Sequence, residues 1–451
     1  MLRLGMEAAA ISQATRLSGL KRIVPASLVK RILRQSDQHT RIGARLPAQL
    51  VLWFVLALGL FCRDCYRQVF RALRPFRRGG VPGRSTLCEA RHRLGTRPLV
   101  LLARQVVQLL GRPDTPEAFY RRMRLMAVDG FVLDVPDSPT NARVFGRSPG
   151  SRGASAFPQL RVLALCEAGT HVIWRWLSKP IRCSEQSMCP PLLRELQAGM
   201  LLLWDRNFLS FARVQQVVSR GAHLLARVQK NPVFKPIKRL ADGSYLAKLY
   251  PTKAHRRRDR DGVIVRIIEY TFADPGRPGT GPRHRLLTTL RDATLDPAPA
   301  LIALYHERWE EELAIDELKT HQLERPVLRS QTPAGVIQEL YALLLDHYIL
   351  RVLMVEAAVQ QQLPPRRMSF TATLKILRCR IPEYPARPSA QRRWWSDLLA
   401  EISDEPLPPR RDRINPRVIK RKMSKWKKKR PHHYHYPQPT MHFRQSIRML
   451  H

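Results

Sequence analysis

Two short apolar runs, each ending at an aspartate, place the strongest constraint on the fold. Leu125 to Val128 is followed by Asp129, and Met200 to Trp204 is followed by Asp205. Apolar runs of roughly 4 to 8 residues are typical of strands buried in the centre of a sheet. Ligands and catalytic groups collect at the ends of such strands in α/β proteins. The two runs therefore predict an α/β sheet that holds two aspartates where catalytic groups are expected.

Further strands and helices surround these runs. Leu160 to Leu165 and Val172 to Trp176 flank the turn Ala168-Gly169-Thr170, which predicts a hairpin. Other strand-like runs are Leu224 to Val228, Val263 to Tyr270 and Leu286 to Leu290. Helices are expected over residues 186 to 198, from about Pro299 to Thr320, and between 333 and 361.

The N-terminal region has helical periodicity instead. Ser27 precedes apolar residues at helical spacing. The longest apolar run, Leu50 to Cys62, has 13 residues, fewer than the roughly 20 that a helix needs to cross a bilayer. We therefore expect a buried core helix there and no membrane span.

Basic residues accompany the next two expected helices. The first carries a basic stripe of Arg63, Arg67, Arg71 and Arg74 beside an apolar one. After the glycine-rich turn at 79–83, Ser85 is expected to cap a second helix that carries Arg91 and Arg93. Helix, tight turn and basic helix suit DNA docking, and an ordinary helical bundle with exposed arginines is the alternative.

The charge balance points to a polyanionic partner. The chain has 78 Lys and Arg against 36 Asp and Glu, a formal net charge of +42. Residues 1–112 hold 21 basic against 4 acidic residues, and residues 410–430 hold 12 against 1. Such a surface attracts nucleic acid and releases its counterions. The tail Arg410 to Arg430 is expected either to contact DNA phosphates or to be a disordered solubilising segment.

Composition excludes several other classes of protein. With 44% apolar residues the chain can bury a core, so it is not of the intrinsically disordered type. Seven cysteines do not make a disulfide framework in a chain of this size. Cys62 and Cys65 form a lone CxxC, for which core thiols are favoured over zinc. The first twenty residues lack a secretory pattern, so we expect a cytoplasmic protein.

A third carboxylate lies in the helix expected before Thr320. At about 100° per residue, Tyr305, Arg308, Glu312 and Lys319 share one face within about 60°. This face borders the apolar one, where charges need partners. The alternative is a solvated Arg308–Glu312 ion pair, which would stabilise the helix by roughly a few tenths of a kcal/mol. Together with the two aspartates, the pattern favours a site.

Other polar residues compete for these roles. Asp134 and Asp137 are interpreted as turn formers, and Asp316 is the second choice if Glu312 is dispensable. Solvated positions are expected for Glu307, Glu310, Glu311 and Glu317. Metal binding is disfavoured for His306 and for the tail cluster His432, His433 and His435, and the tail histidines are interpreted as phosphate contacts.

The motifs together resemble transposases of the insertion-element-four family. They are the Tyr-x2-Arg-x3-Glu-x6-Lys pattern, Asp129-Gly130-Phe131 leading into Val135 to Asn141, and Leu203 to Phe208. The resemblance covers roughly residues 20 to 350 and implies a ribonuclease H-like core with a DDE triad. Two residues depart from the usual pattern: Phe131 stands where many members have Thr, and Asn207 where many have Gly. Neither change removes a metal ligand.

The resemblance also implies roles for individual residues. Asp129, Asp205 and Glu312 become the metal-holding catalytic triad, and Tyr305, Arg308 and Lys319 become DNA contacts near the transposon end. Three carboxylates suit two Mg²⁺ ions, with Mn²⁺ as a substitute. The expected reaction is cleavage at the element's ends and joining of the 3′ ends to target DNA. Synapsis of two ends implies a homodimer on DNA.

The chain is accordingly divided into three parts. Residues 1–115 are the expected helical DNA-binding domain, 120–350 the ribonuclease H-like catalytic domain with a β-rich insertion at about 215–290, and 351–451 a helical, Pro-rich basic region. Two alternatives remain at this point. One is a catalytically inactive, transposase-derived DNA-binding protein, and the other is a DDE nuclease without strand transfer.

Overall fold

The chain folds into two compact units, seen here in a computed structural model. The structure describes residues 16–38, 44–73, 80–150, 153–229, 232–277, 280–306, 309–385, 387–408, 431 and 439–450, without the side chains of 16 and 309–312. Unit 1 comprises Met1–Phe119, Asp129–Met188 and Glu310–Leu407. Unit 2 comprises Tyr120–Val128, Cys189–Trp309 and Pro408–His451. Strand β2 (Met123–Asp134) begins in unit 2 and ends in unit 1.

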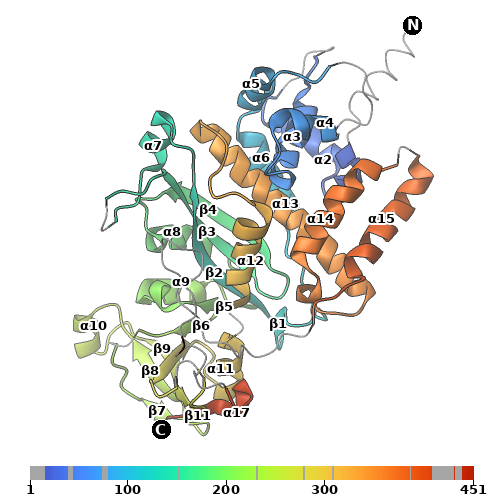
Figure 1. The fold of residues 1–451 in the computed structure, drawn as a ribbon. Coiled ribbons are helices and arrows are strands. Elements are labelled where there is room, and N and C mark those ends of the chain that lie inside the picture. The colour runs from blue at the N-terminus through green and yellow to red at the C-terminus, as the bar shows by residue number, and fades with distance from the viewer. Residues whose placement is uncertain are drawn as a thin grey trace. The chain divides into compact units, whose positions relative to one another are not determined.

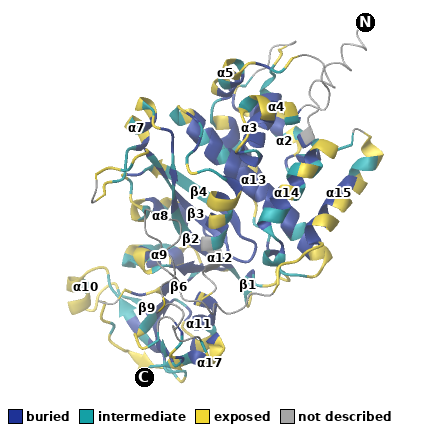
Figure 2. Cartoon of the chain, in the orientation of Figure 1, coloured by how far each residue is buried: buried dark blue, intermediate teal, exposed yellow. Residues whose placement is uncertain are grey.

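The N-terminal part of unit 1 is helical, as the periodicity predicts. After the short 3-10 helix Arg16–Arg22, its helices are α2 (Ala26–Gln35), α3 (Ala48–Leu60), α4 (Tyr66–Leu73), α5 (Arg84–Leu94) and α6 (Arg97–Val106). All of α3 from Leu50 onward is buried, which suits a helix that is apolar all round (Figure 2). Helix α3 packs on the long helix α13 (Pro333–Gln360). The prediction of a buried core helix is confirmed.

Gly59 makes the contact between α3 and α13 possible. A Cβ at this position would lie 2.8 Å from the backbone of Ala342 and 2.2 Å from the carboxylate of Asp346. Only glycine allows two helices to approach this closely. Figure 1 shows α13 passing beside α3, with α14 (Phe370–Arg380) and α15 (Pro388–Ser403) close to it on the same side of unit 1.

The expected basic helix differs from the prediction at Arg91. Its side chain is 2% exposed and donates to Gln338 Oε1 and Ser330 Oγ, each at 3.2 Å. It therefore ties α5 to α13 and is not available to DNA. The expected cap is also wrong, because α5 begins after Gly83 without a side-chain cap. Arg93 is exposed, as are Arg63, Arg67 and Arg71, whereas Arg74 lies outside the described residues.

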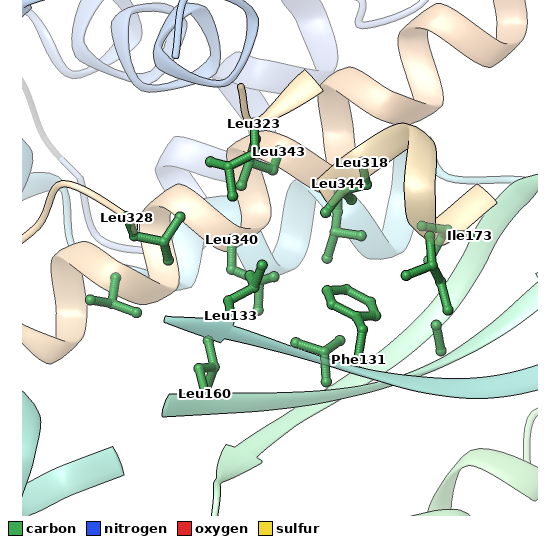
Figure 3. Close-up of a cluster of buried hydrophobic side chains, with 14 of the residues drawn as sticks. Phe131, Leu133, Leu160, Ile173, Leu318, Leu323, Leu328, Leu340, Leu343 and Leu344 are labelled. Carbon is green, nitrogen blue, oxygen red and sulfur yellow. The ribbon is translucent and has the colours of Figure 1, made fainter. Parts of the chain in front are cut away.

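The sheet of unit 1 is built on an antiparallel hairpin. Strands β3 (Gln159–Glu167) and β4 (Val172–Pro180) pair as expected, and β2 lies beside β3. Alternate residues of β2 and β3 point to one face, since side chains alternate along a strand. Figure 3 shows Phe131, Leu133 and Leu160 on this face, opposite Leu340 and Leu344 of α13. The hydrophobic core of unit 1 lies between this face and α13.

Further elements complete unit 1. These are α7 (Pro139–Phe145), the start of α8 (Glu185–Leu193), α12 (Trp309–Asp316), the π-helical segment Glu317–Gln322, and the short 3-10 helices Pro365–Arg367 and Ile381–Glu383. Helix α8 is shorter than predicted and contains Pro190 and Pro191, which weaken a helix because proline lacks an N–H.

Unit 2 combines parallel and antiparallel strands. The first half of β2 is parallel to β5 (Met200–Trp204), which is parallel to β6 (His223–Arg227). Antiparallel strands follow beyond β6 in the order β10 (His284–Thr288), β9 (Val263–Phe272), β8 (Tyr245–Leu249) and β7 (Lys238–Arg239). The strand runs expected between 222 and 290 are therefore confirmed.

Helices and a C-terminal strand complete unit 2. The helices are the 3-10 helix Arg206–Phe208, α9 (Phe211–Ser219), α10 (Lys253–Arg257), α11 (Ala298–His306) and α17 (Phe443–Ser446). Strand β11 (Ile447–Met449) pairs with β9, although the sequence predicts no strand over these residues. The short strand β1 (Phe119–Tyr120) pairs with β2. Among the described helices, none is long and apolar enough to span a bilayer.

Candidate active site

Asp129 lies in the middle of β2, on the face that carries the core of unit 1. The strand continues to Asp134, so Asp129 is not its last residue, in contrast to the sequence expectation. Gly130 faces the other way, because a Cβ there would lie 2.5 Å from the carboxyl group of Glu185. Alternation then places Asp129 on the same face as Phe131. Its Oδ1 accepts a hydrogen bond from the Gly130 N–H at 2.8 Å.

Asp205 follows the last residue of β5. The final register pair of the parallel strands β2 and β5 is Val128 with Trp204, each directly before one of the two aspartates. Asp205 caps the short 3-10 helix that follows, and its Oδ1 accepts from the Arg206 N–H at 2.7 Å. Asp205 is half-buried and Asn207 is exposed.

Tyr305 connects α11 to this strand end. Its hydroxyl donates to the Trp204 carbonyl oxygen at 3.1 Å, and the residue is 8% exposed. The last turn of α11 is thus held directly beside the residue that precedes Asp205.

The helix expected over Pro299 to Thr320 does not keep α-helical bonding to its end, because a π-helical segment begins at Glu317. Before it, the structure describes α11 up to His306 and α12 from Trp309, and residues 307 and 308 lie outside the described residues. Arg308 lies outside the described residues, and Glu312 lies in α12 without a described side chain. Because a π-helix bonds each residue to the fifth along, it alters the rotation of later residues, so the projection that aligned Lys319 with Glu312 no longer applies. Lys319 is exposed.

The expectation that Glu317 is solvated is wrong. Its side chain is 13% exposed and accepts from Arg351 Nη2 at 2.5 and 2.7 Å. His171 and His347 lie at 3.1 and 3.2 Å from its two oxygens. Burial alone would raise the pKa of this carboxyl group, but Arg351 and His171 outweigh burial and hold the pKa well below its usual range. The sequence contains no local signal for this cluster, because the partners come from distant segments.

The competing carboxylates have partners of their own. Asp134 accepts from Gln159 Nε2 at 2.8 Å, as the last residue of β2 and not as a turn former. Asp137 lies in the following loop and pairs with Arg147. Asp316 is exposed and accepts from Thr320 Oγ1 at 2.5 Å.

The remaining metal candidates do not form a site among the described side chains. Among the described side chains, no group of three His, Cys, Asp or Glu is arranged so that it could hold a metal ion, and the side chain of Glu312 is not among those described. Cys62 is a buried thiol whose pKa burial raises to about 12, whereas Cys65 is exposed. The His306 ring stacks on the Phe443 ring, with 3.8 Å between the ring centroids. The tail histidines and Arg410 to Arg430 lie outside the described residues.

Comparison with known proteins gives consistent matches. Residues 14–103 match the insertion element 4 transposase N-terminal family, and residues 120–347 match the transposase DDE domain. The transposase InsG for insertion sequence element IS4 of Escherichia coli strain K12 is 26% identical over 421 residues, 91% of this chain and 93% of that protein. The putative transposase InsZ of the same strain is 27% identical over 215 residues, 46% of this chain and 70% of that protein.

One solved structure is also similar. A cryo-EM structure of a piggyBac transposase synaptic complex with hairpin DNA has 11% sequence identity and a TM-score of 0.43, with 89% of this chain and 87% of that chain covered.

The family follows from these matches and the fold. The DDE-domain match covers just over half of the chain. The helical N-terminal region and the mixed sheet with its helices form the expected α/β fold with a ribonuclease H-like core. A DDE domain implies a divalent metal cofactor and DNA as the partner. The chain belongs to the insertion-element-4 family of DDE transposases.

Proposed function

We propose that this transposase binds the ends of its insertion element, cleaves the DNA phosphodiester bonds and joins the 3′ ends to target DNA. The observation that carries the proposal is the register of β2 and β5. Val128 and Trp204 are partners in parallel strands, and each is followed directly by an aspartate. Two carboxylates that follow paired positions suit a shared metal site.

Glu312 is proposed as the third member of the triad. Within unit 1, α12 and the π-helical segment pack through Ile315 and Leu318 into the same cluster as Phe131. Asp129 is on the face of β2 that carries Phe131, so α12 covers the face from which Asp129 projects. This supports the assignment of Glu312, whose side chain lies on that helix.

The donor set fits a hard divalent cation. Asp129, Asp205 and Glu312 offer only carboxylate oxygens, the ligands that Mg²⁺ prefers and Mn²⁺ also accepts. Asp129, Asp205 and Glu312 would together hold the ions. Two such ions, when bound, stabilise the charge on the attacking and leaving oxygens of a phosphodiester.

The chain's own residues would orient the DNA. Arg308 and Lys319 are proposed to hold phosphates near the cleaved bond through charge-assisted hydrogen bonds. Tyr305 is proposed as a third DNA contact, and its bond to the Trp204 carbonyl also fixes the strand end before Asp205. One site would serve hydrolysis at the element's end and attack of the freed 3′ hydroxyl on target DNA. Two ends handled together require a homodimer on DNA.

Exposed cations in both units offer surfaces to the DNA backbone. In unit 1 they lie on and beside α4, at Arg63, Arg67 and Arg71. In unit 2 they lie on and after α10, in the connection between β8 and β9. The acidic Asp259 in that connection is bound by Lys248 at 2.7 Å and Tyr250 at 2.6 Å. Its charge is therefore offset, and Arg256 and Arg257 remain exposed.

Alanine substitution of the triad tests the proposal. Asp129→Ala, Asp205→Ala and Glu312→Ala should each abolish cleavage of DNA that natively flanks this gene, because a ligand of the metals is lost. Binding of the same DNA should stay nearly unchanged. Cleavage is measured on end-labelled DNA in Mg²⁺, with the exposed Asp397→Ala in α15 as the control. Cleavage by any of the three variants would remove that residue from the triad.

The same assay separates the alternatives. Metal-independent DNA binding without cleavage by the wild type would indicate an inactive, transposase-derived binding protein. Cleavage without joining to target DNA would indicate a nuclease.

A further inference from the structure

A buried polar cluster directly follows the helix that carries Glu312. It consists of Glu317, His171, His347 and Arg351, all in unit 1. Glu317 is the first residue of the π-helical segment, His171 lies in the turn between β3 and β4, and His347 and Arg351 lie one turn apart on α13. We call these four residues the Glu317 cluster.

The contacts of the cluster join three elements through one carboxylate. Arg351 Nη2 donates to both oxygens of Glu317, at 2.5 and 2.7 Å. His171 Nδ1 lies 3.1 Å from one oxygen and His347 Nε2 lies 3.2 Å from the other. His171, His347 and Arg351 are each at most 2% exposed. The start of the π-helical segment is therefore bound to both the hairpin and α13.

Stability alone is a poor explanation for this cluster. Removing an Arg–Glu pair and two imidazoles from water costs about as much as the pair regains, and apolar residues of similar size often stabilise a fold equally well. A buried carboxylate with directional hydrogen bonds restricts the helix that carries it to one position relative to its neighbours. Apolar contacts such as those of Ile315 and Leu318 let a helix slide or rotate slightly, whereas hydrogen bonds to both carboxylate oxygens do not.

The geometry points to a positioning role. We infer that the Glu317 cluster sets the rotation and axial position of α12, and thereby places the Glu312 carboxylate for metal binding. Glu317 follows the last residue of α12 and is five residues beyond Glu312. The π-helical turn begins at Glu317, and such turns are frequent at functional sites. This inference rests on the proposed function, since it takes Glu312 to be a metal ligand.

The first test is the Mg²⁺ dependence of cleavage by Glu317→Gln, which keeps the side-chain shape and removes the charge. We expect the Mg²⁺ concentration for half-maximal cleavage to rise about tenfold and the saturated rate to fall by about 10- to 100-fold, since a displacement of about 1 Å costs up to roughly 100-fold. Binding of the flanking DNA should stay within about twofold of the wild type. The control is Glu401→Gln, which removes an exposed Arg–Glu pair at 2.6 Å.

The second test separates positioning from folding. In the double variant Glu317→Leu with Arg351→Met, apolar side chains replace the ion pair, so the melting temperature should recover relative to Glu317→Gln. The Mg²⁺ dependence should stay shifted. A double variant with wild-type Mg²⁺ dependence, or a Glu317→Gln variant that melts earlier yet cleaves with unchanged Mg²⁺ dependence, would show a merely structural role.

The two proposals fail in different ways. If wild type and Asp397→Ala cleave, Glu312→Ala does not, and Glu317→Gln behaves as wild type, only the positioning role is overturned. If Glu312→Ala cleaves as well as wild type, the catalytic assignment of Glu312 fails, and the inference about Glu317 fails with it.

Discussion

At the scale of single residues, Asp346 shows how burial changes the chemistry of a carboxyl group. It lies in the middle of α13 beside Gly59, and its side chain is fully buried. Neither of its oxygens has a hydrogen-bond partner among the described residues. Burial raises its pKa well above the usual range, and the Arg378 charge offsets only part of that rise. The folded protein therefore favours the protonated acid.

This predicts a pH effect on stability. A carboxyl group whose pKa is higher in the folded state contributes stability that is fully present below its unfolded pKa of about 3.9 and is lost as the pH rises through the folded value. Asp346→Asn keeps the shape and cannot ionise. It should be more stable than wild type at pH 8, by on the order of 1–3 kcal/mol, with little difference at pH 4. Urea unfolding at both pH values measures this, and a less stable Asn variant at pH 8 would contradict the account.

Residue-scale predictions from the sequence succeeded where the signal is local. The apolar runs of β3 and α3 identify buried positions directly. The predictions that Arg91 and Glu317 are exposed were wrong for one shared reason. A charged residue on a helix is ordinarily solvated. These two are buried because residues far away in the sequence, on α13 and in other segments, hydrogen-bond to them.

At the scale of elements, the helix before Thr320 shows the limit of periodicity. The residue pattern predicts a helix there, and helices are found. At Glu317, however, the backbone hydrogen bonds change from the α-helical to the π-helical spacing, which is one residue longer, and the sequence carries no signal for this change. Strand β11 was missed because three residues paired at an edge carry no pattern. By contrast, the two apolar runs before Asp129 and Asp205 correctly indicated buried strands of an α/β sheet, and the structure shows that these strands are neighbours.

An element-scale prediction concerns α10. The double variant Arg256→Gln with Arg257→Gln should weaken DNA binding and lower the slope of log affinity against log salt by up to about 2, since each phosphate contact contributes roughly 0.9. Sequence preference should not change, because backbone contacts carry none. The matched control neutralises two exposed arginines of α15, Arg392 and Arg393. Equal salt slopes for wild type and the α10 variant would show that α10 does not contact DNA.

At the scale of the whole molecule, the family's DNA chemistry is consistent with the charge of the chain. A net charge of +42 suits a protein that holds DNA along much of its surface. Segments of the catalytic region enter both units, and β2 passes from one into the other directly before Asp129. Composition and motifs could predict the fold class and the family, because both depend on patterns within the chain. The contacts of Glu317 depend on packing between distant segments and could not be predicted in this way.

The most direct test of the account is excision of a marked DNA segment bounded by the sequences that natively flank this gene. Wild-type protein and Glu312→Ala are compared in Mg²⁺, and both excised and reinserted segments are counted. The account predicts that the wild type excises the segment and inserts it elsewhere, whereas Glu312→Ala binds the ends and does neither. Binding of the ends by both proteins without excision by either would contradict it.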